Sequence, residues 1–305
     1  MRTLDYHPIE LLHEWETRIN RPRSRPECGE ALLERWSAPS GTASLGCPLS
    51  TEPDLMIVLT TFARPEGAAR VLSALGEALE RAGLRDRASL LVLHDACASN
   101  YSAARATARE ACPALLWLDA RQRFGKSAFW KVHQTAMLVA RSWRPKLALY
   151  LQDDVEFESD LVLRALQLWR ATEGDERRRV LYLFSSSDDE ARGRWVNFER
   201  REAGPCRLTN WFDLQAFVVD RAFFELLGHR MVPIHENRWK RKPEQSSGVG
   251  RQFTRRLFGR ASVYQAWPPL VVHGASPSTM NPEARKQRTL DNRSDYIPSN
   301  RRSAA

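Results

Sequence analysis

Continuous apolar runs alternate with segments of helical periodicity from residue 55 onward. The apolar runs are typical of buried strands, and the segments between them place apolar residues on one face of a helix. Strands are expected at 55–61, 90–94, 115–118 and 147–151, and helices at 66–82, 102–111 and 127–143. This strand–helix succession predicts an α/β domain with a mostly parallel central sheet, flanking helices and right-handed crossovers.

The pattern is weaker beyond residue 169. Further strands are expected at 180–184, 214–219 and 269–273, and Asp160 and Asp220 stand where the caps of two more helices are expected. Residues 1–50 combine short amphipathic helices with a basic, proline-containing loop. We therefore expect an N-terminal helical and basic arm (1–50), a main domain with two halves (51–160 and 161–280) and a basic C-terminal tail (281–305).

The bulk properties predict a globular protein. The chain has 305 residues and 43% hydrophobic content, enough for a sizeable core. No apolar run reaches 18 residues and the first residues do not resemble a signal peptide, so a soluble, cytoplasmic protein without transmembrane association is expected. The five cysteines are scattered and lack C-x-x-C spacing, which argues against a disulfide framework or a zinc cluster.

Positive charge is concentrated in two segments. The net charge is +9, and residues 229–260 hold nine Lys and Arg against two acids, while residues 285–302 hold six against two. Such clustering favours a polyanion-binding face, although an Arg-rich solvated surface gives the same pattern. The candidate nucleic-acid contacts are Lys240, Arg241, Lys242, Arg251, Arg255 and Arg256.

Two adjacent carboxylates, Asp153 and Asp154, follow the apolar run 147–151. Ligands bind at the carboxyl ends of the strands in open α/β sheets, and carboxylate oxygens there suit Mg²⁺ or Mn²⁺ with a phosphorylated substrate. The alternative is that the aspartates cap the next helix.

The order of several motifs resembles that of the GT-A glycosyltransferases, which bind a nucleotide-sugar on a Rossmann-like first half and an acceptor on the second. The resemblance covers roughly residues 55–280. It rests on Thr60-Thr-Phe-Ala-Arg-Pro65, Asp95, Arg123-Phe-Gly-Lys-Ser127, Gln152-Asp-Asp154 and Pro268-Pro-Leu-Val-Val-His-Gly274. It implies a UDP-sugar as donor, bound by residues 51–160.

The resemblance also assigns roles to individual residues. Asp154 would be the principal metal ligand with His273, an imidazole that favours Mn²⁺ over Mg²⁺. Asp153 would contact the sugar or ribose and Asp95 the uridine, while Gln152 departs from the acidic pattern. Contacts to the nucleotide and its diphosphate are expected from Thr60, Thr61, Arg64, Gly125, Lys126, Lys131 and Ser276.

The catalytic base is the weakest part of the pattern. The region where the family usually places it reads Gln245-Ser-Ser-Gly-Val-Gly250 and has no acid. Asp213, Glu236 and Glu244 are the substitutes, and Asp213 ranks first because Trp211 and Phe212 beside it could stack on an acceptor. Retention or inversion at the anomeric carbon is left open.

Three interpretations of the acceptor compete. The first is a hydroxymethylated pyrimidine, such as hydroxymethylcytosine, in double-stranded DNA, as for phage-type enzymes acting in a host cytoplasm. The second is a polysaccharide, lipid-linked or protein acceptor. The third is a nucleic-acid-binding protein that keeps this fold without catalysis. The clustered positive charge favours the first, because DNA binding depends on it.

Overall fold

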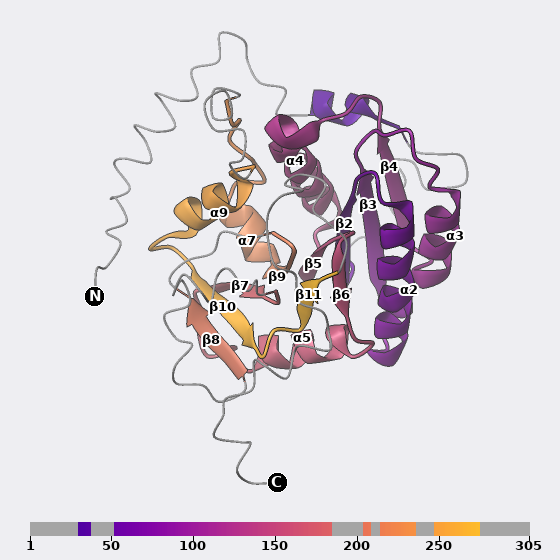
Figure 1. Ribbon diagram of the computed structural model, residues 1–305. Coiled ribbons are helices and arrows are strands. Elements are labelled where there is room, and N and C mark those ends of the chain that lie inside the picture. The colour runs from indigo at the N-terminus through magenta and orange to yellow at the C-terminus, as the bar shows by residue number, and fades with distance from the viewer. Residues whose placement is uncertain (1–29, 38–51, 185–203, 209–213, 236–246, 275–305) are drawn as a thin grey trace.

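The computed structural model describes residues 30–37, 52–184, 204–208, 214–235 and 247–274 (Figure 1). In chain order its elements are η1 (Glu30–Arg35), β1 (Trp36–Ser37), β2 (Leu55–Thr61), α2 (Pro65–Arg81), η2 (Arg85–Arg87), β3 (Ala88–His94), α3 (Ser102–Ala111), β4 (Leu115–Ala120), α4 (Gly125–Trp143), β5 (Leu147–Gln152), β6 (Val155–Phe157), α5 (Leu161–Arg170), β7 (Arg178–Tyr182), β8 (Gly204–Leu208), β9 (Ala216–Asp220), α7 (Arg221–Leu226), α9 (Val249–Leu257), β10 (Ser262–Trp267) and β11 (Val271–His273).

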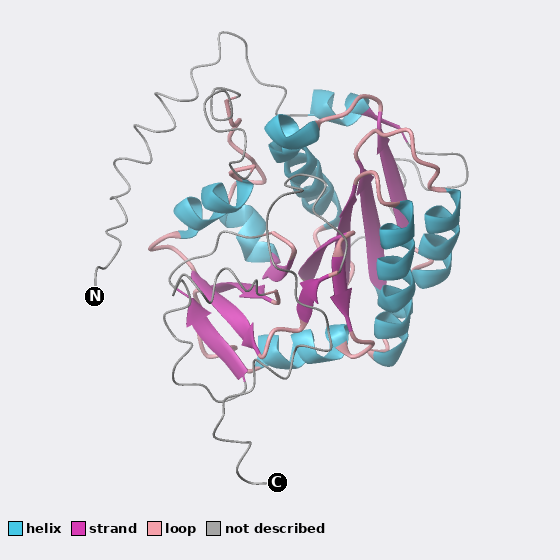
Figure 2. Cartoon of the chain, viewed as in Figure 1, coloured by secondary structure: helices cyan, strands magenta, loops and turns pink. Residues whose placement is uncertain are grey.

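The centre of the molecule is a nine-stranded sheet with the strand order β1-β4-β3-β2-β5-β9-β7-β10-β8. Strands β4, β3, β2, β5, β7 and β10 run in one direction, and β1, β9 and β8 run in the other. Figure 2 shows the sheet with helices packed around it. The predicted class, an α/β fold with a mostly parallel sheet flanked by helices, is confirmed.

Helices cover both faces of the first half of the sheet. The chain moves outward from β2 through α2, β3 and α3 to β4, and α4 then returns it to β5 on the other side of β2. Right-handed crossovers therefore place α2 and α3 on one face and α4 on the opposite face, as Figure 1 shows. All seven residues of β2 are buried, because a central parallel strand is covered on both sides. The reversal of strand order puts a topological switch point between β2 and β5.

Several elements were not expected from the sequence. Strand β6 pairs with β11 in a separate antiparallel ladder, and β8 and β10 form the far edge of the main sheet. Helix α9 lies in the basic segment 229–260. The strands are short or follow irregular sequence, so their periodicity was too weak to identify them. Helix α9 does place its buried residues at helical spacing, and it was missed within the basic segment.

Part of the segment expected as an arm joins the sheet. Strand β1 pairs with β4, and the side chains of Leu32 and Trp36 are buried in the core. The indole N–H of Trp36 donates to the Thr135 hydroxyl at 2.9 Å. The domain limits themselves remain a prediction. None of the helices in the described part of the chain has the length and hydropathy needed to span a bilayer.

The two expected helix caps differ. Asp220 accepts a hydrogen bond from the Phe223 N–H at 2.8 Å and so caps α7. Asp160 occupies the N-cap position of α5, but its side chain accepts no capping hydrogen bond. Its carboxylate instead forms a salt bridge with the Arg164 guanidinium, with an N–O distance of 3.7 Å.

Candidate functional site

Three turns meet at the carboxyl ends of β2, β3 and β4, beside the switch point. The Asp95 N–H after β3 donates to the Thr61 carbonyl at the end of β2. The two oxygens of the Asp95 carboxylate accept from the N–H groups of Phe124 and Gly125, at 2.6 and 2.9 Å. Gly125 adopts a φ of 61°, which a residue without a Cβ adopts without strain. Asp95 therefore fixes the turn that begins α4, and its predicted contact with uridine stays a prediction.

Asp153 is buried and bonded to the end of β2. Its Oδ2 accepts from the Thr61 hydroxyl at 2.7 Å and from the Phe62 N–H at 2.9 Å. The Tyr101 hydroxyl lies 2.9 Å from the Thr61 hydroxyl and accepts from the Arg64 N–H. The turn after β2 is thus built around a carboxylate, with Thr61 holding that carboxylate in place.

The helix-cap alternative for the two aspartates is wrong, because β6 intervenes before α5 begins at Leu161. Burial and the neighbouring Asp154 carboxylate raise the pKa of Asp153 to about 7, against the hydrogen bonds from Thr61 and Phe62 and the charge of Arg64. The buried, hydrogen-bonded Asp153 therefore orients both the turn after β2 and the turn between β5 and β6.

Asp154 lies between a histidine and an arginine from distant parts of the chain. Its Oδ2 is 3.2 Å from an Arg64 guanidinium nitrogen and 3.8 Å from Nδ1 of His273. His273 reaches this position because it pairs with Val155 in the β6–β11 ladder, while the Gly274 N–H donates to the Asp154 carbonyl. The Phe184 ring packs edge-on against the imidazole at 4.7 Å.

The surroundings of the Asp154 carboxylate fit a divalent cation that is also bound by a substrate. The Asp154 side chain is 12% exposed, and its Oδ1 is buried without a hydrogen-bond partner in the described residues. A carboxylate oxygen and an imidazole are ligands that Mn²⁺ accepts. Within the described ranges, no cluster of three or more His, Cys, Asp or Glu side chains could hold a metal. Of the described residues, Asp154 and His273 would supply two ligands, and diphosphate oxygens and water could occupy other positions.

The first turn of α2 lies directly against this site. Helix α2 begins at Pro65, whose missing N–H costs nothing in the first turn of a helix. A Cβ added to Gly67 would lie 2.7 Å from the Asp153 carbonyl oxygen, so only glycine permits this approach. The N–H groups at the start of a helix attract anions, which places a favourable field for phosphate beside Asp154.

The remaining donor-contact candidates lie near these turns. Thr60 is buried at the end of β2 and pairs with Gln152. Lys126 and Lys131 occur in the first two turns of α4, and the Lys131 ammonium lies 5.7 Å from the Trp130 ring. The Arg123 guanidinium stacks on Phe62 at 4.4 Å, which brings the turn before α4 against the turn after β2.

Other candidates fall outside the described residues. These are the three catalytic candidates, one donor contact and three of the nucleic-acid contacts, namely Asp213, Glu236, Glu244, Ser276, Lys240, Arg241 and Lys242. The other three nucleic-acid candidates belong to α9. Arg251 is exposed and Arg255 is partly exposed, whereas Arg256 donates to the carbonyls of Leu227 and Arg230 and so ties α9 to the loop after α7.

Sequence reasoning missed Tyr101, whose hydroxyl joins the Thr61 and Arg64 contacts. It precedes α3 in a loop, and no spacing rule indicates which loop hydroxyl reaches a neighbouring strand.

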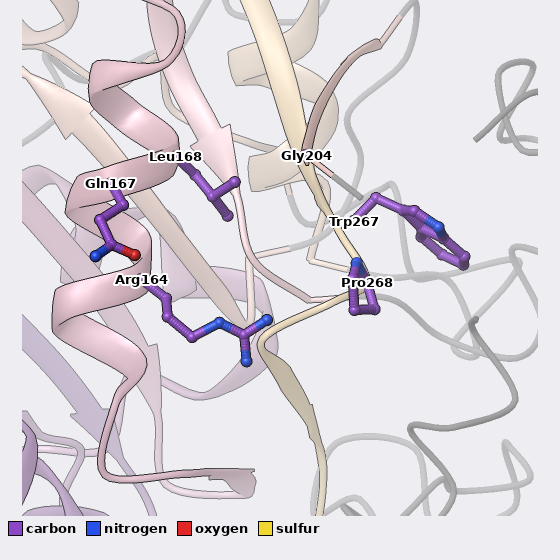
Figure 3. A pocket seen from close by; sticks show the side chains of 6 residues that line it. All are labelled: Arg164, Gln167, Leu168, Gly204, Trp267 and Pro268. Carbon is purple, nitrogen blue, oxygen red and sulfur yellow. The ribbon is translucent and has the colours of Figure 1, made fainter. Parts of the chain in front are cut away.

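A pocket of about 220 Å³ lies between α5 and the chain that precedes β11 (Figure 3). Its lining consists of Arg164, Gln167, Leu168, Gly204, Trp267 and Pro268. Figure 3 shows Arg164 and Leu168 extending from α5 toward the side on which Pro268 lies. None of the predicted site residues lines it, and its lining has no carboxylate or histidine.

Comparison with known proteins gave matches among solved structures only. No protein-family model and no curated protein sequence matches the chain. The mannosyltransferase PcManGT from Pyrobaculum calidifontis, in complex with GDP-Man and Mn²⁺, is similar at 17% identity and a TM-score of 0.43, over 72% of this chain and 54% of that one. S. aureus TarS 1-349 in complex with UDP is similar at 13% identity and a TM-score of 0.47, over 70% of this chain and 60% of that one. The chain thus spans less than two thirds of either structure.

Proposed function

We propose that this protein is a metal-dependent glycosyltransferase that moves a sugar from a UDP-sugar to a hydroxyl acceptor. The observation that carries the proposal is the meeting of Arg64, Asp154 and His273 at the switch point, where one buried Asp154 oxygen has no hydrogen-bond partner among the described residues. A cationic side chain, two candidate metal ligands and a helix N-terminus are groups that can stabilise the negative charge of a departing nucleoside diphosphate.

Each residue has a defined task in this proposal. Asp154 and His273 would hold Mn²⁺, or Mg²⁺, which when bound would stabilise the negative charge that develops on the diphosphate. Arg64 would contact the diphosphate beside them, since fixed cations aimed at developing charge lower the barrier. Asp153 would hold the turn that carries Arg64, through Thr61 and Phe62.

The acceptor is the finer part of the proposal. We propose a hydroxymethylated pyrimidine in double-stranded DNA, in the cytoplasm, supported by the clustered basic residues and by the exposed Arg251 on α9. A carboxylate would deprotonate the acceptor hydroxyl, and Asp213, Glu236 and Glu244 are the candidates. The alternatives are a polysaccharide, lipid-linked or protein acceptor, and binding without catalysis.

Mn²⁺-dependent release of UDP from a pool of UDP-sugars tests the reaction. Asp154→Asn should reduce kcat/KM at least about a hundredfold, because it weakens binding of the metal that would stabilise the leaving diphosphate. Asp54→Asn is the matched control. Asp54 directly precedes β2, at the amino ends of the parallel strands and so away from the site, and it pairs with Arg87 and Lys146. Release that needs no metal, or that survives in Asp154→Asn, would contradict the proposal.

Mass spectrometry of nucleosides tests the acceptor. Duplex DNA containing hydroxymethylcytosine is incubated with the protein, Mn²⁺ and nucleotide-sugars, and a sugar-mass adduct on the base is expected. Arg251→Glu should weaken action on DNA and spare UDP release, whereas Arg109→Glu, an exposed arginine on the distant α3, should change neither. UDP release without an adduct would move the acceptor to the second class, and the absence of both signals favours the non-catalytic alternative.

A further inference from the structure

A cysteine, a histidine and an aspartate form a connected triad beside the site described above. His94 ends β3, and its Nε2 lies 3.3 Å from the Cys97 sulfur in the following loop. Its Nδ1 lies 2.7 Å from Oδ1 of Asp119. Asp119 pairs with His94 in the parallel β3–β4 ladder, which explains why the two side chains meet. The proposed glycosyl transfer uses none of these three residues.

The aspartate is held as a charged hydrogen-bond acceptor. An Arg105 nitrogen donates to both Asp119 oxygens, at 2.9 and 2.8 Å, and the Trp117 indole N–H donates to Oδ1 at 2.9 Å. Burial raises the pKa of Asp119, but its bonds to His94, Trp117 and Arg105 outweigh burial and lower it overall. A charged Asp119 favours a proton on Nδ1 of His94, which leaves Nε2 to take the proton of the thiol.

The environment of Cys97 favours its thiolate. Burial raises the pKa of the thiol, but the hydrogen bond with His94 and backbone N–H groups of Ser99 and Ala63 outweigh it and lower the pKa overall. Burial lowers the pKa of His94, and its bonds to Asp119 and Cys97 outweigh that and raise it. Among the described residues, the titratable and charged groups that face the pair are Asp119, Arg105 and the Tyr101 phenol, whose ring is tilted against the imidazole with the centroids 4.1 Å apart.

Cys112 provides an internal contrast. It is completely buried at the end of α3, and burial raises the pKa of its thiol to about 11. Its sulfur donates to backbone carbonyls. Cys97 is partly exposed and bonded to an imidazole instead. Reactive cysteines have partial exposure and a cationic or basic neighbour, whereas buried structural cysteines are inert.

We propose that Cys97 is a site of covalent thiol modification, in which His94 activates the sulfur and Asp119 positions His94. The substrates are soft electrophiles and hydroperoxides. With hydrogen peroxide, the thiolate attacks one oxygen, an S–O bond forms and the O–O bond breaks. The departing hydroxide takes the proton from the His94 imidazolium and leaves as water. Sulfur is oxidised by two electrons to a sulfenic acid, and the peroxide is reduced.

Alkylation of the full-length chain by iodoacetamide tests the proposal. The modification rate of each cysteine is followed by peptide mass spectrometry between pH 5.5 and 9. An ordinary thiol is only a few per cent thiolate at pH 7, so Cys97 should react about tenfold faster than glutathione at that pH. Cys112 should stay unmodified and so report that the fold is intact.

Two variants separate activation from accessibility. His94→Asn and Asp119→Asn should move the Cys97 pH profile to higher pH and remove the rate advantage at pH 7, and Cys97→Ser should abolish modification at this position. A sulfenic-acid probe after peroxide treatment should label Cys97 and miss Cys112. A Cys97 profile with its midpoint at or above that of glutathione would overturn the proposal. An alkylation profile of Cys97 that both His94→Asn and Asp119→Asn leave unchanged would also overturn it. If a variant does not fold, the profile of the unaltered protein alone decides the question.

Discussion

His133 is the residue for which the structure gives the sharpest prediction of pH-dependent stability. It lies on α4 with 2% of its surface exposed, and neither ring nitrogen has a hydrogen-bond partner in the described residues. The centroid of its ring lies 4.9 Å from that of Phe129, 5.8 Å from that of Phe253 and 5.9 Å from that of Tyr150. No acid among the described residues pairs with the imidazolium, and burial lowers the pKa of His133 to about 3.

The sign of the effect follows from proton counting. Below about pH 6.5 the unfolded chain binds a proton at His133, while the folded chain does so only near pH 3. The unfolded state therefore binds more protons in this window, and the free energy of unfolding falls as the pH falls. At about 1.4 kcal/mol per pH unit, the loss is about 2 kcal/mol at pH 5 and roughly 5 kcal/mol when the full shift is expressed.

Replacing the His133 imidazole with a phenyl ring removes this pH-dependent loss of stability. Denaturant unfolding at pH 7.5, 6 and 5, followed by tryptophan fluorescence, measures it, and the difference between two proteins cancels the other titrating groups. Between pH 7.5 and pH 5, the free energy of unfolding of the unaltered protein should fall by about 2 kcal/mol more than that of His133→Phe. The packing cost of the larger ring is present at both pH values and cancels in this comparison. His133→Leu offers a second shape if the phenyl ring does not fit.

Phe253→Leu is the matched control. It removes ring contacts in the same cluster and so should lower stability by a similar amount at every pH. Parallel stability profiles for His133→Phe and the unaltered protein, within about 0.5 kcal/mol, would refute the reasoning. That outcome would show that His133 accepts a proton in the folded state.

Three further predictions follow from single contacts. Gly67→Ala should strongly reduce Mn²⁺-dependent UDP release, because the added Cβ would lie 2.7 Å from the Asp153 carbonyl oxygen. Gly174→Ala should not reduce it, since a Cβ there meets nothing within 4 Å, and steady-state kinetics of both variants tests this. Asp220→Ala should lower the free energy of unfolding by about 1 kcal/mol through loss of the α7 cap, measured in urea, and an unchanged midpoint would contradict it. If UDP occupies the turn after β2, it should slow Cys97 alkylation several-fold, since an Ala63 N–H reaches the Cys97 sulfur; equal rates with and without UDP would argue against that placement.

Much of the first half of the fold was predictable from periodicity. Strand β2 was expected at its observed limits, and helices α2 and α4 within two residues of theirs, because long buried segments alternate regularly. Strands β6, β8 and β10 were not, because they are short or follow irregular sequence. The pairing of β6 with β11 brings residues 155–157 beside 271–273, and no local pattern encodes it.

The sequence by itself determined that two carboxylates follow a buried strand at the ligand-binding edge of an α/β sheet, because hydrophobic periodicity and strand polarity are local properties. Only the tertiary structure decided their different surroundings. Asp153 bonds to Thr61 and Phe62 of the neighbouring turn, whereas Asp154 lies near Arg64 and His273. The physical reason is that a side chain's partners depend on which other segments pack against it, and these contacts join residues that lie between 90 and 119 positions apart in the chain.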